Sequence, residues 1–366
     1  MSQTFNLQEH IAKGVEKIVA DTLKATLRDP RESAFMARFA IAANKATRRR
    51  LELEKEGLHV PSFLIASITS AYNLHCDGCY SRCNAATVDG APVKQLDTAE
   101  WTAIFREAES LGVSFIMLAG GEPMLRRDVI EAAGGMKNLL FPIFTNGTHM
   151  DDAAFALLDR CRNLIPVLSI EGDREITDSR RGAGVYDRLV AAMDGLHERG
   201  LLFGASITVT TENLRQVTSP EYIRTLVDKG CKLVIYVEFV PVTAEARHLA
   251  PGEGERAFLL TSTQKLREVY PELMALAFPG DERADEGCMA AGRGFFHINS
   301  HGGAEPCPFS PYSDVNVRDM GMRAALQSPL FMALRDGGVL DDDHIGGCVL
   351  YEKREVVEQL LARGKG

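Results

Sequence analysis

Short apolar runs alternate with amphipathic helical patterns through the middle of this chain. The apolar runs end near Thr69, Ala119, Thr145, Ile170, Thr210 and Val240. Between them, apolar residues recur at helical spacing in segments 98–111, 127–137, 153–162, 187–200 and 219–230. Strands that alternate with helices pair in parallel through right-handed crossovers. The pattern therefore predicts an α/β fold, a partial (β/α)6 barrel of the TIM type.

Two further helices are predicted before the barrel. Apolar residues recur every four positions in segment 5–27, and a second helix is expected over 31–55, with a basic cluster at Arg48, Arg49 and Arg50. Packing against the barrel or a second subunit is favoured over a partner-binding or membrane-surface role, because amphipathic helices are most often core helices. We expect an N-terminal helical region at 1–58, a barrel at 59–245 and a small α+β extension at 246–366.

Polar or glycine-rich segments follow four of the predicted strands. They are a cysteine run at 75–84, Gly120–Pro123, Thr145–Thr148 and Ser169–Glu171. In parallel barrels, functional groups gather on loops at the carboxyl ends of the strands. The sequence therefore predicts one site at one rim of the barrel.

The cysteine run contains Cys76, Cys79 and Cys83. Three closely spaced thiolates, with no signal peptide to suggest an oxidising compartment, more often hold a metal or cluster than form a disulfide. Iron–sulfur is favoured over zinc because no fourth Cys or His follows at zinc-finger spacing, and an iron without a protein ligand can bind a cofactor.

The phrase Tyr72-Asn-Leu-His-Cys-Asp-Gly-Cys-Tyr80 resembles the cluster motif of the radical S-adenosylmethionine (SAM) superfamily. In that motif, Tyr72 stands where the first cluster cysteine is expected, and Cys83 follows the last one. The preferred interpretation is that Cys83 replaces the missing ligand, since clusters are held overwhelmingly by thiolates. Two alternatives stay open: a cluster held by two cysteines with Tyr72 or an outside ligand, and a protein that no longer holds this cluster.

Other landmarks of the superfamily follow in order. The resemblance implies that the turn Gly120, Gly121, Glu122 and Pro123 binds the methionyl amino group of SAM, with Asn146 at the next strand tip. It also places Ser169 and Glu171 near the ribose, and it makes Arg181 a candidate for the SAM carboxylate or ribose. The alternative for Arg180 and Arg181 is a solvated charge pair at a helix start.

A second cysteine-rich region follows the barrel. Cys288, Cys307 and Cys348 resemble the start of the twitch or SPASM extensions of radical SAM enzymes, which hold an auxiliary cluster, and 295–299 with 304–306 would form its hairpin. Three cysteines suit a single-cluster twitch, whose fourth iron would be open to substrate or closed by His344 or another side chain. The alternative of buried thiols stays open here, and it is favoured for Cys161 and Cys231.

Composition sets limits that agree with this interpretation. The chain has 366 residues, eight cysteines and a formal charge of −9, with 45% apolar residues. This length suits one large domain with a small appendage, and the absence of an eighteen-residue apolar stretch argues against a membrane span. The negative charge argues against a nucleic-acid substrate, and the cysteines suit a reducing cytoplasm.

The resemblance implies a radical SAM enzyme with a [4Fe-4S] cluster, SAM and an auxiliary iron–sulfur cluster. Such an enzyme takes an electron from a donor such as a flavodoxin or ferredoxin and abstracts a hydrogen atom from a substrate. Family analogy ranks a peptide slightly ahead of a small molecule, and no catalytic acid, base or radical-bearing residue is identified. Two other functions stay open: an iron–sulfur or electron-transfer protein that does not cleave SAM, and a zinc-stabilised scaffold.

Overall fold

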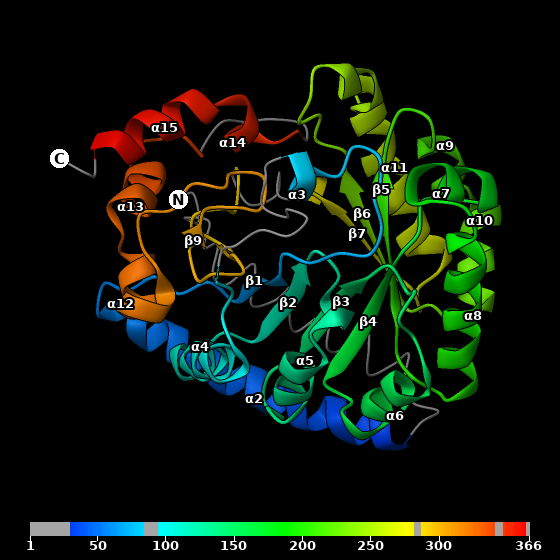
Figure 1. Ribbon diagram of the computed structural model, residues 1–366, viewed down its shortest axis with the longest axis horizontal. Coiled ribbons are helices and arrows are strands. Elements are labelled where there is room, and N and C mark those ends of the chain that lie inside the picture. Colours follow the sequence, from blue (N-terminus) through cyan, green and yellow to red (C-terminus); the bar gives the residue numbers. More distant parts are fainter. Residues whose placement is uncertain (1–29, 84–93, 282–286, 341–346, 364–366) are drawn as a thin grey trace, which may run out of the picture.

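The computed structural model describes residues 30–83, 94–281, 287–340 and 347–363. The expected helix at 5–27 and His344 lie outside these residues. One nine-stranded sheet organises the described chain, in the order β7-β6-β5-β4-β3-β2-β1-β8-β9 (Figure 1). Its strands are β1 (Phe63–Thr69), β2 (Phe115–Gly120), β3 (Phe141–Thr145), β4 (Leu164–Ser169), β5 (Gly204–Val209), β6 (Leu233–Glu238), β7 (Met274–Phe278), β8 (His297–Ile298) and β9 (Ala304–Glu305).

The predicted α/β fold and unclosed parallel barrel are confirmed. Neighbouring strands from β1 to β7 pair in parallel, β8 pairs in parallel with β1, and only β9 runs antiparallel to its neighbour. β7 and β9 lie at opposite ends of the sheet and do not pair with each other. The predicted hairpin is present as β8 and β9.

The described chain has helices between the strands, which cover the outside of the sheet, and further helices at the rim and after β9 (Figure 1). They are α2 (Pro30–Lys55), α3 (Tyr80–Cys83), α4 (Thr98–Leu111), η1 (Pro123–Leu125), α5 (Arg127–Gly134), α6 (Asp152–Arg160), α7 (Arg174–Arg181), α8 (Val185–Glu198), α9 (Leu214–Val217), α10 (Pro220–Asp228), η2 (Glu245–Leu249), α11 (Glu253–Val269), α12 (Val317–Leu326), α13 (Pro329–Asp336), α14 (Val349–Glu352) and α15 (Arg354–Arg363). In the part of the chain that the structure describes, no helix combines the length and apolarity that a bilayer crossing requires.

The sequence of α4 shows how these helices form. Asp97 and Glu100 make a reciprocal capping box at its start, and Gly112 ends it in the left-handed conformation. Its buried residues, which include Trp101 and Phe105, recur at helical spacing and join the main core. This match between caps and apolar spacing explains why the predicted bounds of 98–111 are confirmed.

The helix α2 closes the opposite end of the barrel from the predicted site. Its residues Met36 and Phe39 pack in a separate apolar cluster with Leu140 and Ile165, which lie at the starts of β3 and β4. The amino ends of the strands are therefore sealed, and the carboxyl ends are left for chemistry.

Alternation along β1 separates an outer face from an inner face. Leu64, Ala66 and Ile68 are fully buried in the main core, whereas Phe63, Ile65 and Ser67 keep partial exposure. Phe63 stacks on Phe115 of β2 at a centroid distance of 4.8 Å. The partly exposed set therefore lines the inside of the partial barrel.

Two parts of the sheet were not expected. β7 adds a seventh parallel strand, and β8 pairs with β1 at Ile65↔His297 and Ala66↔Ile298. Both strands lie beyond residue 245, where the extension was expected to begin. The C-terminal region therefore shares the main sheet, and the expected domain limits stay a prediction.

Candidate active site

The predicted cysteine loop leaves the carboxyl end of β1 and is fastened to α7. The backbone N–H of Asp77 donates to the Arg180 carbonyl at 3.0 Å, and Nε of Arg180 donates back to the Asp77 carbonyl at 3.2 Å. Asp77 lies between Cys76 and Cys79, whose thiols are both partly exposed. The loop is thus held through the backbone groups of Asp77, and both sulfurs stay available.

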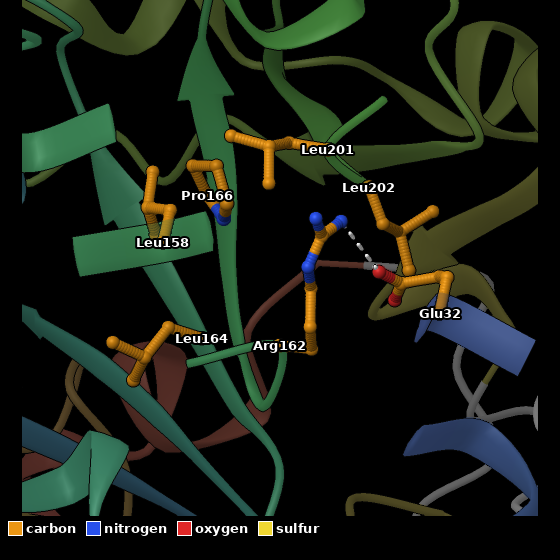
Figure 2. Close-up of a pocket in the computed structure, with 7 residues that line it drawn as sticks. All are labelled: Glu32, Leu158, Arg162, Leu164, Pro166, Leu201 and Leu202. Carbon is orange, nitrogen blue, oxygen red and sulfur yellow. Dashed lines mark hydrogen bonds and ion pairs between the residues drawn. The ribbon is translucent and has the colours of Figure 1, made fainter. Parts of the chain in front are cut away.

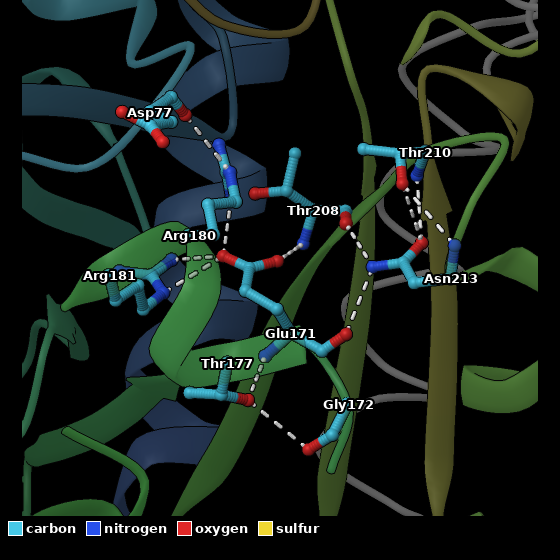
Figure 3. A network of polar contacts seen from close by, with 9 residues as sticks. All are labelled: Asp77, Glu171, Gly172, Thr177, Arg180, Arg181, Thr208, Thr210 and Asn213. Atoms are coloured by element: carbon cyan, nitrogen blue, oxygen red, sulfur yellow. Dashed lines mark hydrogen bonds and ion pairs between the residues drawn. The ribbon is translucent and has the colours of Figure 1, made fainter. Parts of the chain in front are cut away.

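Glu171 lies at the centre of the polar network that receives this loop (Figure 3). One of its carboxylate oxygens accepts hydrogen bonds from Arg180 and from Arg181, the latter through Nε at 2.9 Å. The other accepts the backbone N–H of Thr208 on β5 at 3.0 Å. Because the Glu171 side chain is fully buried, both arginines are drawn inward, and the alternative of a solvated charge pair is wrong.

Asn213 holds the same network from the far side. Its amide donates to the backbone carbonyls of Glu171 and Thr208 at 2.9 and 2.8 Å. Thr177 of α7 accepts the N–H of Glu171 at 3.2 Å, as Figure 3 also shows. Sequence analysis did not identify these two residues as part of the site, because each contacts backbone groups and belongs to no recognisable motif.

Opposing charges meet beside the two thiols. Burial raises the pKa of the Cys76 thiol, and the nearby charges of Arg181 and Arg180 oppose that rise. Burial alone would lower the pKa of Arg181, but the Glu171 carboxylate and then the Cys76 sulfur raise it. The two guanidinium groups are therefore placed to balance negative charge that gathers on the sulfurs.

The Gly120–Gly121–Glu122 turn lies against the start of the cysteine loop. Gly121 donates to the Thr69 carbonyl at 2.9 Å, and the N–H of Glu122 donates to the Ala71 carbonyl at 2.8 Å. A Cβ on Gly121 would lie 1.9 Å from the Ala71 oxygen, so only glycine permits this close approach. Pro123 then begins η1.

The Glu122 carboxylate joins the ends of two strands. It accepts hydrogen bonds from the hydroxyl of Thr145 at 2.7 Å and from the backbone N–H groups of Asn146 and Met124 at 2.9 and 3.0 Å. Burial raises the pKa of Glu122, against the effect of these three donors. Its oxygens are therefore occupied by the protein, and the turn backbone is the better candidate to meet a ligand.

Asn146 connects the tip of β3 to the cysteine loop. Its amide donates to Oδ1 of Asn73 at 2.9 Å, and Nδ2 of Asn73 donates to the Thr148 hydroxyl at 2.8 Å. Asn73 belongs to the motif phrase but was not predicted to have a role. The structure therefore brings the cysteine loop, the glycine turn, the β3 tip and the Glu171 network together at one rim.

Two predicted site residues stay less defined. Ser169 is the last residue of β4 and pairs in register with Ser206 of β5. Cys83 is the last residue of α3, and its side chain lies outside the described part of the structure. The role of each residue stays a prediction.

The second cysteine region lies close to the first. Cys288 and Cys307 are buried, and Cys348 precedes α14. Tyr80, next to Cys79, packs its ring edge-on against Phe309 at 4.7 Å, and its pKa is raised first by burial and then by the charges of Cys79 and Cys307. The described residues contain no set of three or more His, Cys, Asp or Glu side chains already arranged around a metal position, so both ligand sets stay predictions.

Cys348 is anchored to the barrel through the residue before it. Gly347 donates its N–H to the carboxylate of Glu238, the last residue of β6, at 3.0 Å. The other oxygen of Glu238 forms an ion pair with Arg256 of α11. The C-terminal cysteine segment therefore rests on the same rim as the cysteine loop.

A small hollow near α2 lies away from this rim. Figure 2 shows it between α2, the end of α6 and β4, where Arg162 forms a buried ion pair with Glu32 at 3.2 Å. Leucines and Pro166 form the rest of its lining. The contacts at this hollow join α2 to the barrel, so it is not the candidate active site.

Cys161 and Cys231 behave as expected for structural thiols. Cys231 is buried, donates to the Leu233 carbonyl at 3.2 Å, and has its pKa raised to about 12 by burial. Cys161 ends α6 and packs against the main core. Neither thiol lies on a predicted cofactor loop.

Comparison with known proteins supports a cofactor site at this rim. Residues 68–234, which contain the cysteine loop, the glycine turn and the Glu171 network, match the family model of the radical SAM superfamily. This segment is a radical SAM domain. The protein is accordingly a radical SAM enzyme, whose cofactors are a [4Fe-4S] cluster and SAM.

Two curated proteins and one solved structure illustrate the similarity. The chain is 26% identical to the AdoMet-dependent heme synthase of Methanosarcina barkeri over 83% of this chain and 92% of that protein. It is 28% identical to the PqqA peptide cyclase of Gluconobacter oxydans over 75% and 79%. SuiB of Streptococcus suis bound to S-adenosylmethionine superposes with a TM-score of 0.65 at 17% identity, over 80% of this chain and 72% of that one, which supports the fold.

The donors at the rim fit the cluster and SAM. The charge of Cys79 contributes to the raised pKa of Cys76, so the two sulfurs lie near each other. Both residues keep partial exposure, as cluster thiolates require. Arg180 and Arg181 lie beside Cys76, where they could balance the charge of an anionic cluster and offer donors suited to a carboxylate. The expected cofactors are therefore compatible with the residues present.

Proposed function

We propose that this enzyme modifies a peptide, with its cluster held by Cys76, Cys79 and Cys83. When bound, the cluster and SAM supply an organic radical that takes a hydrogen atom from the substrate. The protein contributes positioning, charge balance and exclusion of water.

The observation that carries the proposed cluster site is the pair of reciprocal hydrogen bonds between Asp77 and Arg180. It fixes the segment between Cys76 and Cys79 on α7, and the same arginine reaches the buried Glu171. Such outer contacts orient metal ligands and tune their affinity. A loop with no cofactor to hold would gain little from so much buried charge.

Each remaining contact has a defined role in the proposal. The Gly120–Gly121 turn would present backbone acceptors to the methionyl ammonium, while Glu122 keeps that turn against Asn146. Arg181 would meet the SAM carboxylate or ribose from its place beside Cys76. Ser169 would contact the ribose from the end of β4.

Cys288, Cys307 and Cys348 would hold an auxiliary cluster. Glu238 supports this part of the proposal, since it anchors Gly347 beside Cys348 to the barrel rim. A flavodoxin or ferredoxin would supply the electrons.

A peptide substrate is supported by the relatives. The PqqA peptide cyclase is named for a peptide and resembles this chain over three quarters of its length. The heme synthase matches a larger share of the chain and represents the small-molecule alternative. A deuterium-transfer experiment distinguishes a peptide substrate from a small-molecule substrate.

The test follows deuterium from substrate to cofactor. The full chain is reconstituted anaerobically with iron and sulfide and then reduced with dithionite in the presence of SAM. Extracts of perdeuterated cells that natively contain this protein are divided into a peptide fraction and a metabolite fraction. Each fraction is added separately, and 5′-deoxyadenosine is analysed by mass spectrometry.

We expect the peptide fraction to transfer deuterium into 5′-deoxyadenosine. Transfer from the metabolite fraction alone would show that the substrate is a small molecule. Formation of no 5′-deoxyadenosine, with a fully loaded cluster, would contradict SAM cleavage itself.

A further inference from the structure

A buried polar chain connects the inner wall of the barrel to the C-terminal hairpin. The hydroxyl of Ser67 on β1 lies 2.7 Å from Nε2 of His297 on β8. Nδ1 of His297 lies 2.7 Å from a carboxylate oxygen of Glu305 on β9. His297 and Glu305 are 3% and 5% exposed, so solvent contributes little to either group.

The hydrogen-bond partners of His297 determine which of its ring nitrogens carries a proton. A carboxylate only accepts hydrogen bonds, so Nδ1 of His297 donates to Glu305. In the neutral imidazole, Nε2 then accepts, and the Ser67 hydroxyl donates to it. The second oxygen of Glu305 accepts the amide of Asn299 at 2.6 Å, and Asn299 itself is held by the backbone N–H of Gly303 at 2.8 Å.

Ser67, at one end of this hydrogen-bonded series, faces the inside of the barrel. Ser67 occupies the same partly exposed face of β1 as Phe63 and Ile65. His297 pairs in register with Ile65, and Glu305 pairs with His297, so both lie on this face beside Ser67, where they are buried. In the sheet, Ser67 pairs with Ala119, the residue before the Gly120–Gly121 turn. Its hydroxyl thus lies between the apolar side chains of β1 and the segment expected to bind SAM.

A structural role alone accounts poorly for this arrangement. Burying an ionisable pair requires desolvation of both groups, and an apolar replacement of similar volume is often as stable. Ser67, His297 and Glu305 instead form a continuous donor–acceptor sequence that ends at the inner face. Such a sequence can move a proton from the barrel interior to the imidazole without moving a heavy atom.

We propose that Ser67, His297 and Glu305 form a proton relay that accepts a proton from the bound substrate. A proton would leave an N–H or O–H of the substrate for Oγ of Ser67, while the Ser67 proton moves to Nε2 of His297. The electron pair of the broken bond stays on the substrate atom, and Glu305 stabilises the imidazolium as an unchanged carboxylate. No electron is exchanged, so this step requires neither an oxidant nor a reductant.

This inference rests on the proposed function, and it narrows the substrate class. The group placed against Ser67 would be a hydrogen-bond donor such as an amide, hydroxyl or ammonium. Its carrier would lie against the apolar side chains Phe63 and Ile65 on the same wall.

The first test does not need substrate or cofactors. The full chain is labelled with ¹⁵N-histidine, and His297→Gln identifies the His297 signals by their loss. We expect a proton on Nδ1 of His297, which faces Glu305, and none on Nε2, which faces the Ser67 hydroxyl. Its Nε2 resonance should shift in Ser67→Ala and return in Ser67→Thr, which keeps a hydroxyl. A proton found on Nε2 alone would overturn the relay.

The second test uses the deuterium assay with whichever fraction is active. Ser67→Ala and His297→Gln should lower turnover about 100-fold, while the reconstituted iron content stays at the wild-type value. Ser67→Thr should restore most of the turnover. His301→Gln, at an exposed histidine between the same two strands, is the matched control.

His297→Gln separates a relay from a structural contact. Glutamine offers one donor and one acceptor but carries no transferable proton. Turnover at the wild-type rate in this variant would overturn the proposal. A wild-type enzyme that takes deuterium from neither fraction would contradict the proposed function, and the histidine spectra would still decide the relay.

Discussion

Arg180 and Asp77 hold each other through two backbone carbonyls, although they are 103 positions apart in the chain. The N–H of one residue and the guanidinium of the other complete a closed pair of hydrogen bonds at 3.0 and 3.2 Å. Through this pair, the segment between Cys76 and Cys79 is coupled to the buried Glu171. The first prediction concerns this coupling.

Replacement of Arg180 by alanine should weaken cluster binding by about tenfold or more, since outer contacts of metal ligands have effects of this size. Iron and sulfide per chain after reconstitution and desalting measure the effect. Arg174→Ala is the matched control, because Arg174 lies on the same helix and pairs with Asp187 on the exposed surface. Equal iron retention in both variants would contradict the proposed coupling.

Cys83→Ala should abolish loading of the first cluster if Cys83 replaces the cysteine missing at Tyr72. The double variant Tyr72→Cys with Cys83→Ala should then regain iron, because it restores the usual spacing of the motif. Cys161→Ala controls for the loss of an ordinary thiol. Full retention of iron in Cys83→Ala means that the ligand assignment is wrong.

The stability of the protein should depend on pH through Glu122. Burial raises the pKa of Glu122 above its ordinary value of 4.5, so between the two values the folded state binds more protons than the unfolded state. Its contribution to the free energy of unfolding therefore falls as pH rises through that window, by up to about 1.4 kcal/mol per pH unit.

Urea unfolding at several pH values measures this dependence in the wild type and in Glu122→Gln. The glutamine variant cannot titrate, so its stability relative to the wild type should improve as pH rises above 4.5. Parallel stability curves for the two proteins would contradict the expected titration.

Glu238→Ala should release the segment that carries Cys348. The substitution leaves Arg256 without its carboxylate and Gly347 without its acceptor, at a cost of about 1 to 3 kcal/mol. If Cys348 is a ligand of the auxiliary cluster, Glu238→Ala and Cys348→Ala should lose the same part of the iron and keep the first cluster. Electron paramagnetic resonance of the reduced protein distinguishes the clusters, and Glu245→Ala, at an exposed position, is the control.

The elements that sequence analysis predicted correctly are those with strong local signals. The capping residues and apolar spacing of α4 define that helix without any tertiary information. The rim location of the glycine turn and the cysteine loop follows from parallel pairing, since the carboxyl ends of parallel strands meet at one edge.

The missed elements lacked such signals or depended on distant contacts. The helix α7 is strongly polar and has one fully buried residue, Thr177, so apolar periodicity does not indicate it. Asp173, which caps its first turn, was the available signal. The contacts of Arg180 with Asp77 and of Ser67 with His297 join segments far apart in sequence, and no local pattern specifies such pairs.

The short strand β8 occupies the side of β1 that β2 leaves unpaired. A fragment that ends before residue 288 would expose this edge of β1 to solvent. It would also expose the apolar ring of Phe63, which stacks on Phe295 in the whole chain. Exposed borders of this kind recruit other chains and promote self-association. We therefore expect a fragment that contains only the barrel to associate with itself, because the residues after the barrel cover this edge of the sheet.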